Sequence, residues 1–277
     1  MATALPGAGI EPRDEGFREL AMSRMEAAGR QNVADKVIVE APIALVYNGV
    51  PFAVMMATPC DLEDFALGFA LAEGIIATPA EFELVDVSQS DRGVSLQGLI
   101  PAERFENLQR RKRSLSGRSG CGLCGIESLE EAVRPTPRVA QGPNLGRAAV
   151  AAGMRELAQA QSLNTMTGGA HAAAFIATGR RTIVREDVGR HNALDKLIGA
   201  TARTPEAAPV TSGFLAITSR ASWEMVHKAA HAGIAVVAAI SAPTSLAIEA
   251  ADAAGITLIA FARDESMNVY THAERVT

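Results

Sequence analysis

The chain has 277 residues, enough for one large domain or two modest ones with a substantial hydrophobic core. Its formal net charge of −5 argues against a general nucleic-acid-binding protein. No apolar run is long enough for a transmembrane helix, and the sequence shows no export signal. Few cysteines and no export signal favour a reducing cytoplasm, where structural disulfides are rare.

The first hundred residues divide into two predicted parts. Residues 1–34 hold scattered glycine, proline and charge, and they predict a disordered leader. Residues 35–101 predict a small α+β domain, in which Asn48-Gly49 is a strong hairpin signal between apolar segments. The expected strands are residues 36–40, 43–47 and 50–56, and a helix is expected over residues 61–74.

Residues 102–137 predict a basic linker that ends in a mobile loop with a cysteine pair. A charged helix is expected over residues 103–113, and its basic end is either a solvated face or a platform for an anionic substrate or partner. Cys121 and Cys124 follow in a glycine-flanked stretch without hydrophobic period, which indicates an exposed, reactive sulfur site. The spacing alone leaves redox chemistry, metal binding and sulfur transfer open. Cys60 is expected to be a small buried thiol.

The second half, residues 138–277, alternates strand and helix patterns. Continuous apolar strands separated by amphipathic helices predict a buried sheet, parallel in this part, with a three-layer α/β architecture. The expected strands are residues 172–178, 182–186, 214–218, 234–240 and 256–261. The expected helices are residues 222–232 and 244–254, with another beginning near residue 193.

Polar side chains follow three of these strands, at the positions where α/β folds bind ligands. They include Ser219, Arg220, Thr244 and Arg263. Two of the segments lead into helix N-termini, whose free N–H groups attract phosphate, and arginine can form paired hydrogen bonds with phosphate or a guanine-like base edge. The simpler alternative is that Ser222 and Thr244 only cap their helices and that both arginines are solvated. The convergence favours a nucleotide-bearing ligand.

Histidines mark three further segments. His171 follows a Gly-Gly pair, and residues 185–192 place five charged or imidazole groups in one loop, His191 among them. That is more than a plain turn needs, although isolated histidines are more often structural than catalytic. His227 and His231 have the spacing of a zinc-protease helix, but a lysine replaces the required glutamate. A helix surface is therefore expected there, not a metal site.

Several of these segments together resemble the FdhD family. The resemblance is carried by residues 119–125, 168–171, 186–196 and 267–270, within a match from about residue 35 to residue 275. It implies a cytidine-deaminase-like C-terminal fold, a homodimer and a sulfurtransferase that works by persulfide relay. The implied donor is an IscS-like cysteine desulfurase. The implied acceptor is Mo-bis(molybdopterin guanine dinucleotide), bound as substrate before insertion into the formate dehydrogenase catalytic subunit.

The resemblance also implies roles for individual residues. Cys121 is expected to bear the persulfide, with Cys124 as its partner. By this match, the expected cofactor-binding residues are Phe261, Ala262, Arg263, Asp264, Glu265 and Ser266. The polar strand ends and the charged loop add Ser219, Arg220, Thr244 and His191 to this expected site. No tightly held metal of the protein's own is expected.

Two other classes of function stay open. One is a zinc hydrolase that uses Cys121, Cys124 and either His171 or His191, and the other is a non-catalytic chaperone that binds cofactor and apo-enzyme. Deaminase chemistry is not expected, because the C-x-x-C pair precedes the histidine and His171 is followed by alanines instead of H-x-E.

Overall fold

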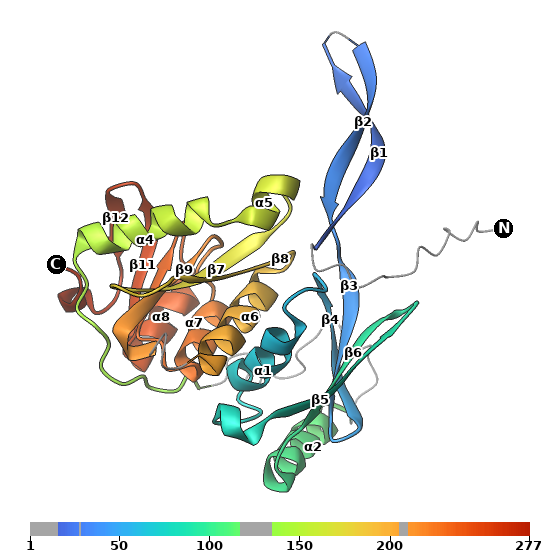
Figure 1. Cartoon of the computed structure of the whole chain (residues 1–277). Helices are drawn as coiled ribbons and strands as arrows, with labels where there is room; N and C mark the ends of the chain where they lie inside the picture. Colours follow the sequence, from blue (N-terminus) through green and yellow to red (C-terminus); the bar gives the residue numbers. More distant parts are fainter. Residues whose placement is uncertain (1–15, 28, 117–134, 205–209) are drawn as a thin grey trace.

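The computed structural model describes residues 16–27, 29–116, 135–204 and 210–277. These residues form a two-stranded ribbon, a four-stranded sheet and a six-stranded sheet (Figure 1). Cys121 and Cys124 lie outside the described residues. Across the described ranges, no helix combines the length and apolar character needed to cross a membrane.

The ribbon is the first described element and was not expected. Strand β1 (Phe17–Glu26) pairs antiparallel with strand β2 (Gly29–Ile38) in an unbroken register from Phe17↔Ile38 to Glu26↔Gly29. The prediction of a disordered leader over residues 1–34 is therefore wrong for residues 17–27 and 29–34, and residues 1–15 lie outside the described part. The ribbon's base meets the short helix α5 (Ser162–Thr167), where Lys36 Nζ lies 4.0 Å from Met166 Sδ.

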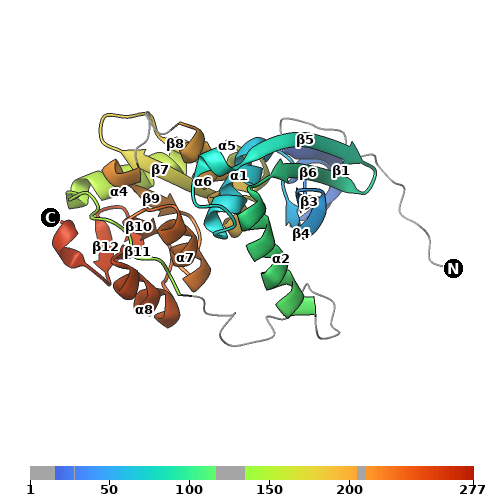
Figure 2. The same ribbon diagram turned by 90° about the horizontal axis from the view of Figure 1, so that it is seen from below.

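The four-stranded sheet confirms the predicted hairpin. Strands β3 (Ala41–Tyr47) and β4 (Val50–Ala57) are joined by Asn48 and Gly49, whose φ angles of 49° and 78° are those of a tight two-residue hairpin turn. Strands β5 (Glu83–Ser90) and β6 (Gly93–Leu99) complete the order β4-β3-β6-β5. The predicted helices are α1 (Leu62–Ala72) and α2 (Ala102–Ser116), and α2 extends away from the sheet (Figure 2).

The six-stranded sheet has the order β12-β11-β10-β9-β7-β8. Strands β9 (Gly213–Ile217), β10 (Val236–Ala239) and β11 (Thr257–Arg263) are parallel, as predicted for this part. Strand β7 (His171–Ala177) is antiparallel to β9 and to β8 (Ile183–Asp187), and β12 (Ser266–Val269) is antiparallel to β11.

Helices cover both faces of this sheet (Figure 1). Helices α6 (Arg190–Arg203), α7 (Trp223–His231) and α8 (Ser245–Ala254) lie on one face, and α4 (Arg147–Gln159) lies on the other. Successive strand residues belong to two separate hydrophobic cores. Phe175 and Leu215 pack towards α6–α8, whereas Ala174 and Phe214 pack towards α4. The three-layer α/β architecture is therefore confirmed.

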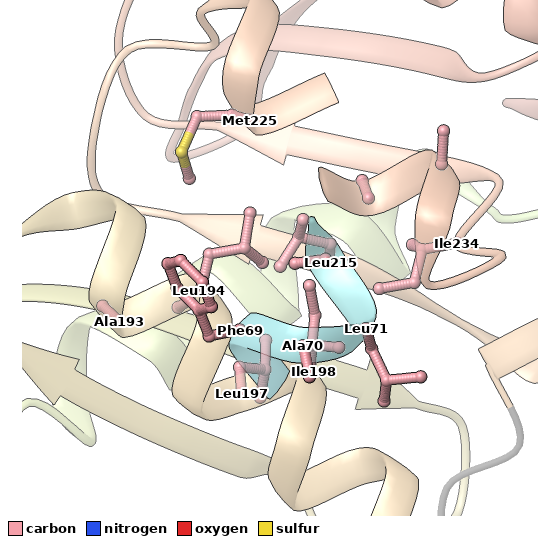
Figure 3. Packing of buried hydrophobic residues seen from close by; sticks show 14 of the residues in the cluster. Phe69, Ala70, Leu71, Ala193, Leu194, Leu197, Ile198, Leu215, Met225 and Ile234 are labelled. Carbon is pink, nitrogen blue, oxygen red and sulfur yellow. The ribbon is translucent and has the colours of Figure 1, made fainter. Parts of the chain in front are cut away.

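Helices α1 and α6 join the two sheets by a close crossing. A Cβ atom added at Gly68 would overlap the backbone of Asp195, and one added at Gly199 would overlap the backbone of Asp64. Apolar side chains of both helices pack around this crossing (Figure 3): Phe69, Ala70 and Leu71 from α1, and Leu194, Leu197 and Ile198 from α6. The larger hydrophobic core is thus continuous from one sheet to the other.

Candidate functional site at the carboxyl edge of the six-stranded sheet

The candidate site is the edge of the six-stranded sheet at which four strands end. Strands β8 and β9 are both antiparallel to β7, so β8 to β11 all point the same way. Helices α6, α7 and α8 follow β8, β9 and β10, so their N-termini return to this edge. His171 at the start of β7 pairs with Asp187 at the end of β8, which brings the Gly-Gly-Ala-His segment to the same edge.

Backbone hydrogen bonds tie the loops of this edge together. The N–H of Ala221 donates to Ala242 O at 3.1 Å, and the N–H of Thr244 donates back to Ala221 O at 3.0 Å. The N–H of Phe261 donates to Ser241 O at 3.1 Å, which attaches the end of β11 to the loop after β10. The structure therefore brings the predicted residues Ser219, Arg220, Thr244 and 261–266 into one continuous rim.

Two arginines present positive charge on this rim. Arg220 and Arg263 are exposed, and Arg263 Nε donates to Ile240 O at 3.0 Å, which fixes the base of its guanidinium. Ser219 is buried, and its hydroxyl donates to Arg220 O at 3.0 Å, so it holds the loop. The exposed guanidinium nitrogens Nη1 and Nη2 can form charge-assisted hydrogen bonds with an anionic or purine ligand.

The residues of the turn between β11 and β12 differ in exposure and in the elements that they contact. Phe261 and Asp264 both have φ near 51°, a left-handed conformation that is unusual for a phenylalanine, and the Phe261 side chain is 40% exposed. Ala262 is buried and Ser266 is exposed. Glu265 is bound on the α4 side, where its carboxylate meets Arg155 Nη1 at 3.0 Å. Of the predicted segment, Glu265 is thus directed towards α4, while Arg263 is held at the end of β10.

Helix N-termini at the edge supply further donors. Thr244 caps α8, since its hydroxyl accepts from the N–H of Ala247 at 3.3 Å, as the simpler interpretation expected. Ser222 occupies the N-cap position of α7 but makes no side-chain capping bond, and Gly189 at the start of α6 has no side chain to do so. The first turn of α6 therefore keeps N–H groups that can meet an anion, whereas the first turn of α7 carries the Glu224 carboxylate.

Two histidines lie at the same edge, and both have lowered pKa values. Burial, with the nearby Arg190 guanidinium, lowers the pKa of His191 to about 4 and also lowers the pKa of His171. His191 Nε2 is 4.0 Å from Glu224 Oε2, and within the described ranges this nitrogen makes no hydrogen bond. Both imidazoles are therefore uncharged at neutral pH, and the charges beside them are those of Arg190 and Glu224.

The other charged groups of residues 185–192 are structural, which the sequence did not indicate. Glu186 accepts from the N–H groups of Leu163 and Asn164 at 2.9 and 2.8 Å, so it caps α5. Arg185 bonds to Asp64 of α1. These contacts explain why the segment holds more charge than a plain turn needs.

Asp187 forms the centre of a buried clamp between the two sheets. Its carboxylate is 2.7 Å from Lys196 Nζ, and both side chains are fully buried. The same carboxylate accepts from the N–H of Thr58 at 3.0 Å, and Lys196 Nζ donates to Thr58 O at 2.9 Å. We refer to Thr58, Asp187 and Lys196 as the interdomain clamp. Cys60 next to it is only partly buried, which corrects the expectation of a buried thiol, and burial raises its pKa.

A second buried ion group corrects the expectation for the histidine-bearing helix. His227 and Lys228 of α7 are 3% and 5% exposed, so this part of the helix is core and not surface. Lys228 Nζ donates to Asp195 Oδ1 at 2.8 Å and to Glu73 Oε1 at 2.9 Å, and these carboxylates raise its pKa. Desolvation raises the pKa of Asp195 to about 6. His227 stacks on Trp223 with a centroid distance of 4.8 Å.

The predicted catalytic cysteines are not placed by the structure. Cys121 and Cys124 fall in residues 117–134, outside the described part of the chain. Where residues are described, no group of three or more His, Cys, Asp or Glu side chains could hold a metal ion. The zinc-hydrolase alternative depends on the two cysteines, so the described residues do not test it.

Comparison with known proteins places the chain in a family. The model of the FdhD/NarQ family matches residues 38–277. A protein of Xanthomonas campestris pv. campestris (strain B100) named Sulfur carrier protein FdhD is 52% identical over 255 residues, covering 91% of this chain and 90% of the relative. A protein of the same name from Variovorax paradoxus (strain S110) is 51% identical, covering 87% of this chain and 87% of the relative. Another from Bordetella petrii is 46% identical, covering 90% of this chain and 89% of the relative.

A solved structure agrees with these sequence matches. The crystal structure of a protein from Desulfotalea psychrophila, provisionally identified as a formate dehydrogenase accessory protein, aligns with a TM-score of 0.72. It is 26% identical and covers 94% of this chain and 99% of its own. The chain therefore belongs to the FdhD/NarQ family.

Proposed function

We propose that this protein is a sulfur carrier that serves the maturation of formate dehydrogenase. The observation that carries the proposal is its family membership, with relatives of about 50% identity named as sulfur carriers over nearly their whole length. The candidate site supports it, since it joins exposed arginines and helix N-termini on one rim. We place the reaction in the cytoplasm, where a thiol pair stays reduced.

The proposed chemistry is a persulfide relay through Cys121. The Cys121 thiolate attacks the terminal sulfur of a persulfide on an IscS-like cysteine desulfurase. The cysteine of the desulfurase is the leaving group and departs as a thiolate. Cys121 then holds the sulfane sulfur as a persulfide. When Cys124 attacks Cys121 Sγ, hydrosulfide departs towards the acceptor and a Cys121–Cys124 disulfide remains, so the two electrons of the sulfide come from the thiol pair.

The proposed acceptor is Mo-bis(molybdopterin guanine dinucleotide), bound as substrate at the candidate site. Its phosphates suit the first turn of α6, and a guanine edge or phosphate suits the paired donors of Arg220 and Arg263. Phe261 offers an exposed ring for stacking. The catalytic subunit of formate dehydrogenase is the proposed receiver of the sulfurated cofactor.

Intact-mass analysis tests the relay. The wild-type chain and the variants Cys121→Ala, Cys124→Ala and Cys60→Ala are each incubated with a cysteine desulfurase and cysteine. We expect a reductant-labile gain of one sulfur mass on the wild type and on Cys60→Ala, and no gain on Cys121→Ala. A gain that persists in Cys121→Ala would contradict the assignment of the carrier residue.

A second candidate function is that of a non-catalytic cofactor chaperone, which the rim of arginines and helix N-termini would also suit. It requires binding but no sulfur transfer. A formate dehydrogenase maturation assay separates the two functions, because a chaperone would keep its effect when Cys121 is replaced by alanine. Loss of maturation with retained cofactor binding would support the sulfur carrier.

A further inference from the structure

The single tryptophan of the chain, Trp223, lies at the carboxyl edge of the six-stranded sheet. It is the first residue of α7, and the residues just before it are fixed, because Ala221 exchanges backbone hydrogen bonds with Ala242 and Thr244 of the next loop. The indole is half-buried. A large aromatic ring that is partly exposed at a ligand-binding edge offers a flat surface on which another ring can stack.

His227 fixes the orientation of this indole. The two rings are stacked, with centroids 4.8 Å apart and planes at 22° to one another. His227 is 3% exposed, and its Nδ1 lies 3.4 Å from Thr136 Oγ1, so the imidazole is a rigid support. Helical side chains lean towards the N-terminus of their helix. His227 therefore covers the indole face nearer the body of α7, and the other face is turned towards the edge of the sheet.

Glu224, the next residue of α7, adds a hydrogen-bond acceptor beside this ring. Its side chain is 50% exposed, and Oε2 lies 4.0 Å from His191 Nε2 at the start of α6. Burial raises the pKa of Glu224, but hydrogen bonds at the start of α7 lower it below its ordinary value, so the carboxylate is ionised at neutral pH. An ionised carboxylate only accepts hydrogen bonds, through two oxygens. It suits a ligand edge with two neighbouring N–H donors, and it disfavours a phosphate.

We propose that the start of α7 binds a 2-amino-4-oxopyrimidine ring, which stacks on Trp223 and donates its ring N–H and its amino N–H to the Glu224 carboxylate. Guanine and pterins both carry this edge. Helices α6 and α7 lie side by side on one face of the sheet (Figure 1), so a ligand whose phosphates meet the first turn of α6 can place its ring on α7. This subsite rests on the proposed function and names the part of the acceptor that the edge recognises.

Calorimetry on the full-length chain with guanosine diphosphate, inosine diphosphate and neopterin tests the role of Glu224. Inosine diphosphate keeps the ring N–H but lacks the amino group, so the wild type should bind it about tenfold more weakly than guanosine diphosphate, the loss of one charge-assisted hydrogen bond. Glu224→Gln should weaken binding of guanosine diphosphate by about the same factor and remove the preference over inosine diphosphate. The control is Glu249→Gln, which changes an exposed carboxylate of α8 and should alter neither Kd. Dependence on Glu224 for guanosine diphosphate assigns the subsite to guanine, and dependence for neopterin alone assigns it to the pterin.

Tryptophan fluorescence tests the stacking contact, because Trp223 is the sole source of the signal. The ring that binds should quench this fluorescence in the wild type. Trp223→Leu should weaken both nucleotides about tenfold and leave their ratio unchanged, since stacking does not distinguish the two bases. Trp223→Phe keeps a stacking ring and should restore most of the affinity, which a merely structural role of the indole would not predict.

Two outcomes would overturn the subsite. If the wild type binds these ligands without a change in fluorescence, or if neither ring loses affinity in Glu224→Gln and Trp223→Leu, the ring binds elsewhere on the edge and the proposed acceptor site still stands. If the wild type binds none of the three ligands, the subsite and the proposed acceptor site both fail. Sulfur loading of Cys121, measured by intact mass, is independent of either result.

Discussion

Replacing Lys196 by methionine tests whether the interdomain clamp stabilises the fold. The substitution removes the fully buried ammonium that lies 2.7 Å from Asp187 and donates to Thr58 O at 2.9 Å. Removing one partner of a buried ion pair costs about 3–5 kcal/mol. The Asp187 carboxylate keeps bonds from the N–H groups of Thr58 and Gly189 and from Asn192 Nδ2. We therefore expect the lower end, a loss of about 3 kcal/mol in the free energy of unfolding.

Urea unfolding at pH 7, followed by circular dichroism, measures this loss. The control is Lys36→Met, whose ammonium lies on the ribbon 4.8 Å from the Phe17 ring centroid and which should change stability by less than about 0.5 kcal/mol. Because Asp187→Asn relieves the uncompensated charge, its combination with Lys196→Met should cost less than the sum of the single changes. A loss below about 1 kcal/mol for Lys196→Met, or strict additivity, would refute the reasoning.

Three further outcomes follow from the charges of the structure. The pKa of His191 is lowered from 6.5 to about 4, so its contribution to the free energy of unfolding is complete above pH 6.5 and is lost as the pH falls towards 4. In urea unfolding at several pH values, His191→Gln should reduce this acid-induced loss of stability by up to about 3 kcal/mol. Parallel pH profiles for the wild type and the variant would contradict this expectation. In calorimetry with guanosine diphosphate as the probe, Arg220→Gln and Arg263→Gln should each raise Kd about tenfold, the cost of one charge-assisted contact, whereas the exposed Arg92→Gln should leave it unchanged. Replacing Arg110, Arg111 and Arg113 together by glutamine should weaken binding of the cysteine desulfurase and flatten its salt dependence; unchanged binding across salt concentrations would make this end of α2 a solvated face.

The regular elements were predictable where one local signal dominated. The Asn48-Gly49 turn and the apolar strands of the second half were placed within a few residues, because turn geometry and burial act on neighbouring positions. The ribbon was missed because nothing local shows where β1 and β2 begin. Strand alternation in residues 17–26 was the signal that could have found it.

The sequence allowed the residues at the candidate site to be predicted, but not which charged residues make structural contacts instead. Strand order brings Arg220, Arg263 and His191 to one edge, as the rule for α/β sheets expects. The clamp was not predictable, because Lys196 and its acceptor Thr58 are 138 residues apart in sequence. Nor could the burial of His227 be expected, since it depends on the packing of α7 against α1, α6 and α8.

Helix α6 connects the clamp to the candidate site. Arg190 and His191 begin the helix at the edge, and Lys196 fixes it to Thr58 less than two turns later. A helix moves as a unit over such a distance, so a looser clamp should displace the donors at its first turn. Lys196→Met should therefore weaken binding of guanosine diphosphate at 15 °C, where the variant remains folded, and Lys36→Met should not. Equal Kd values for the wild type and Lys196→Met would show that the edge keeps its geometry without the contacts of Lys196 in the interdomain clamp.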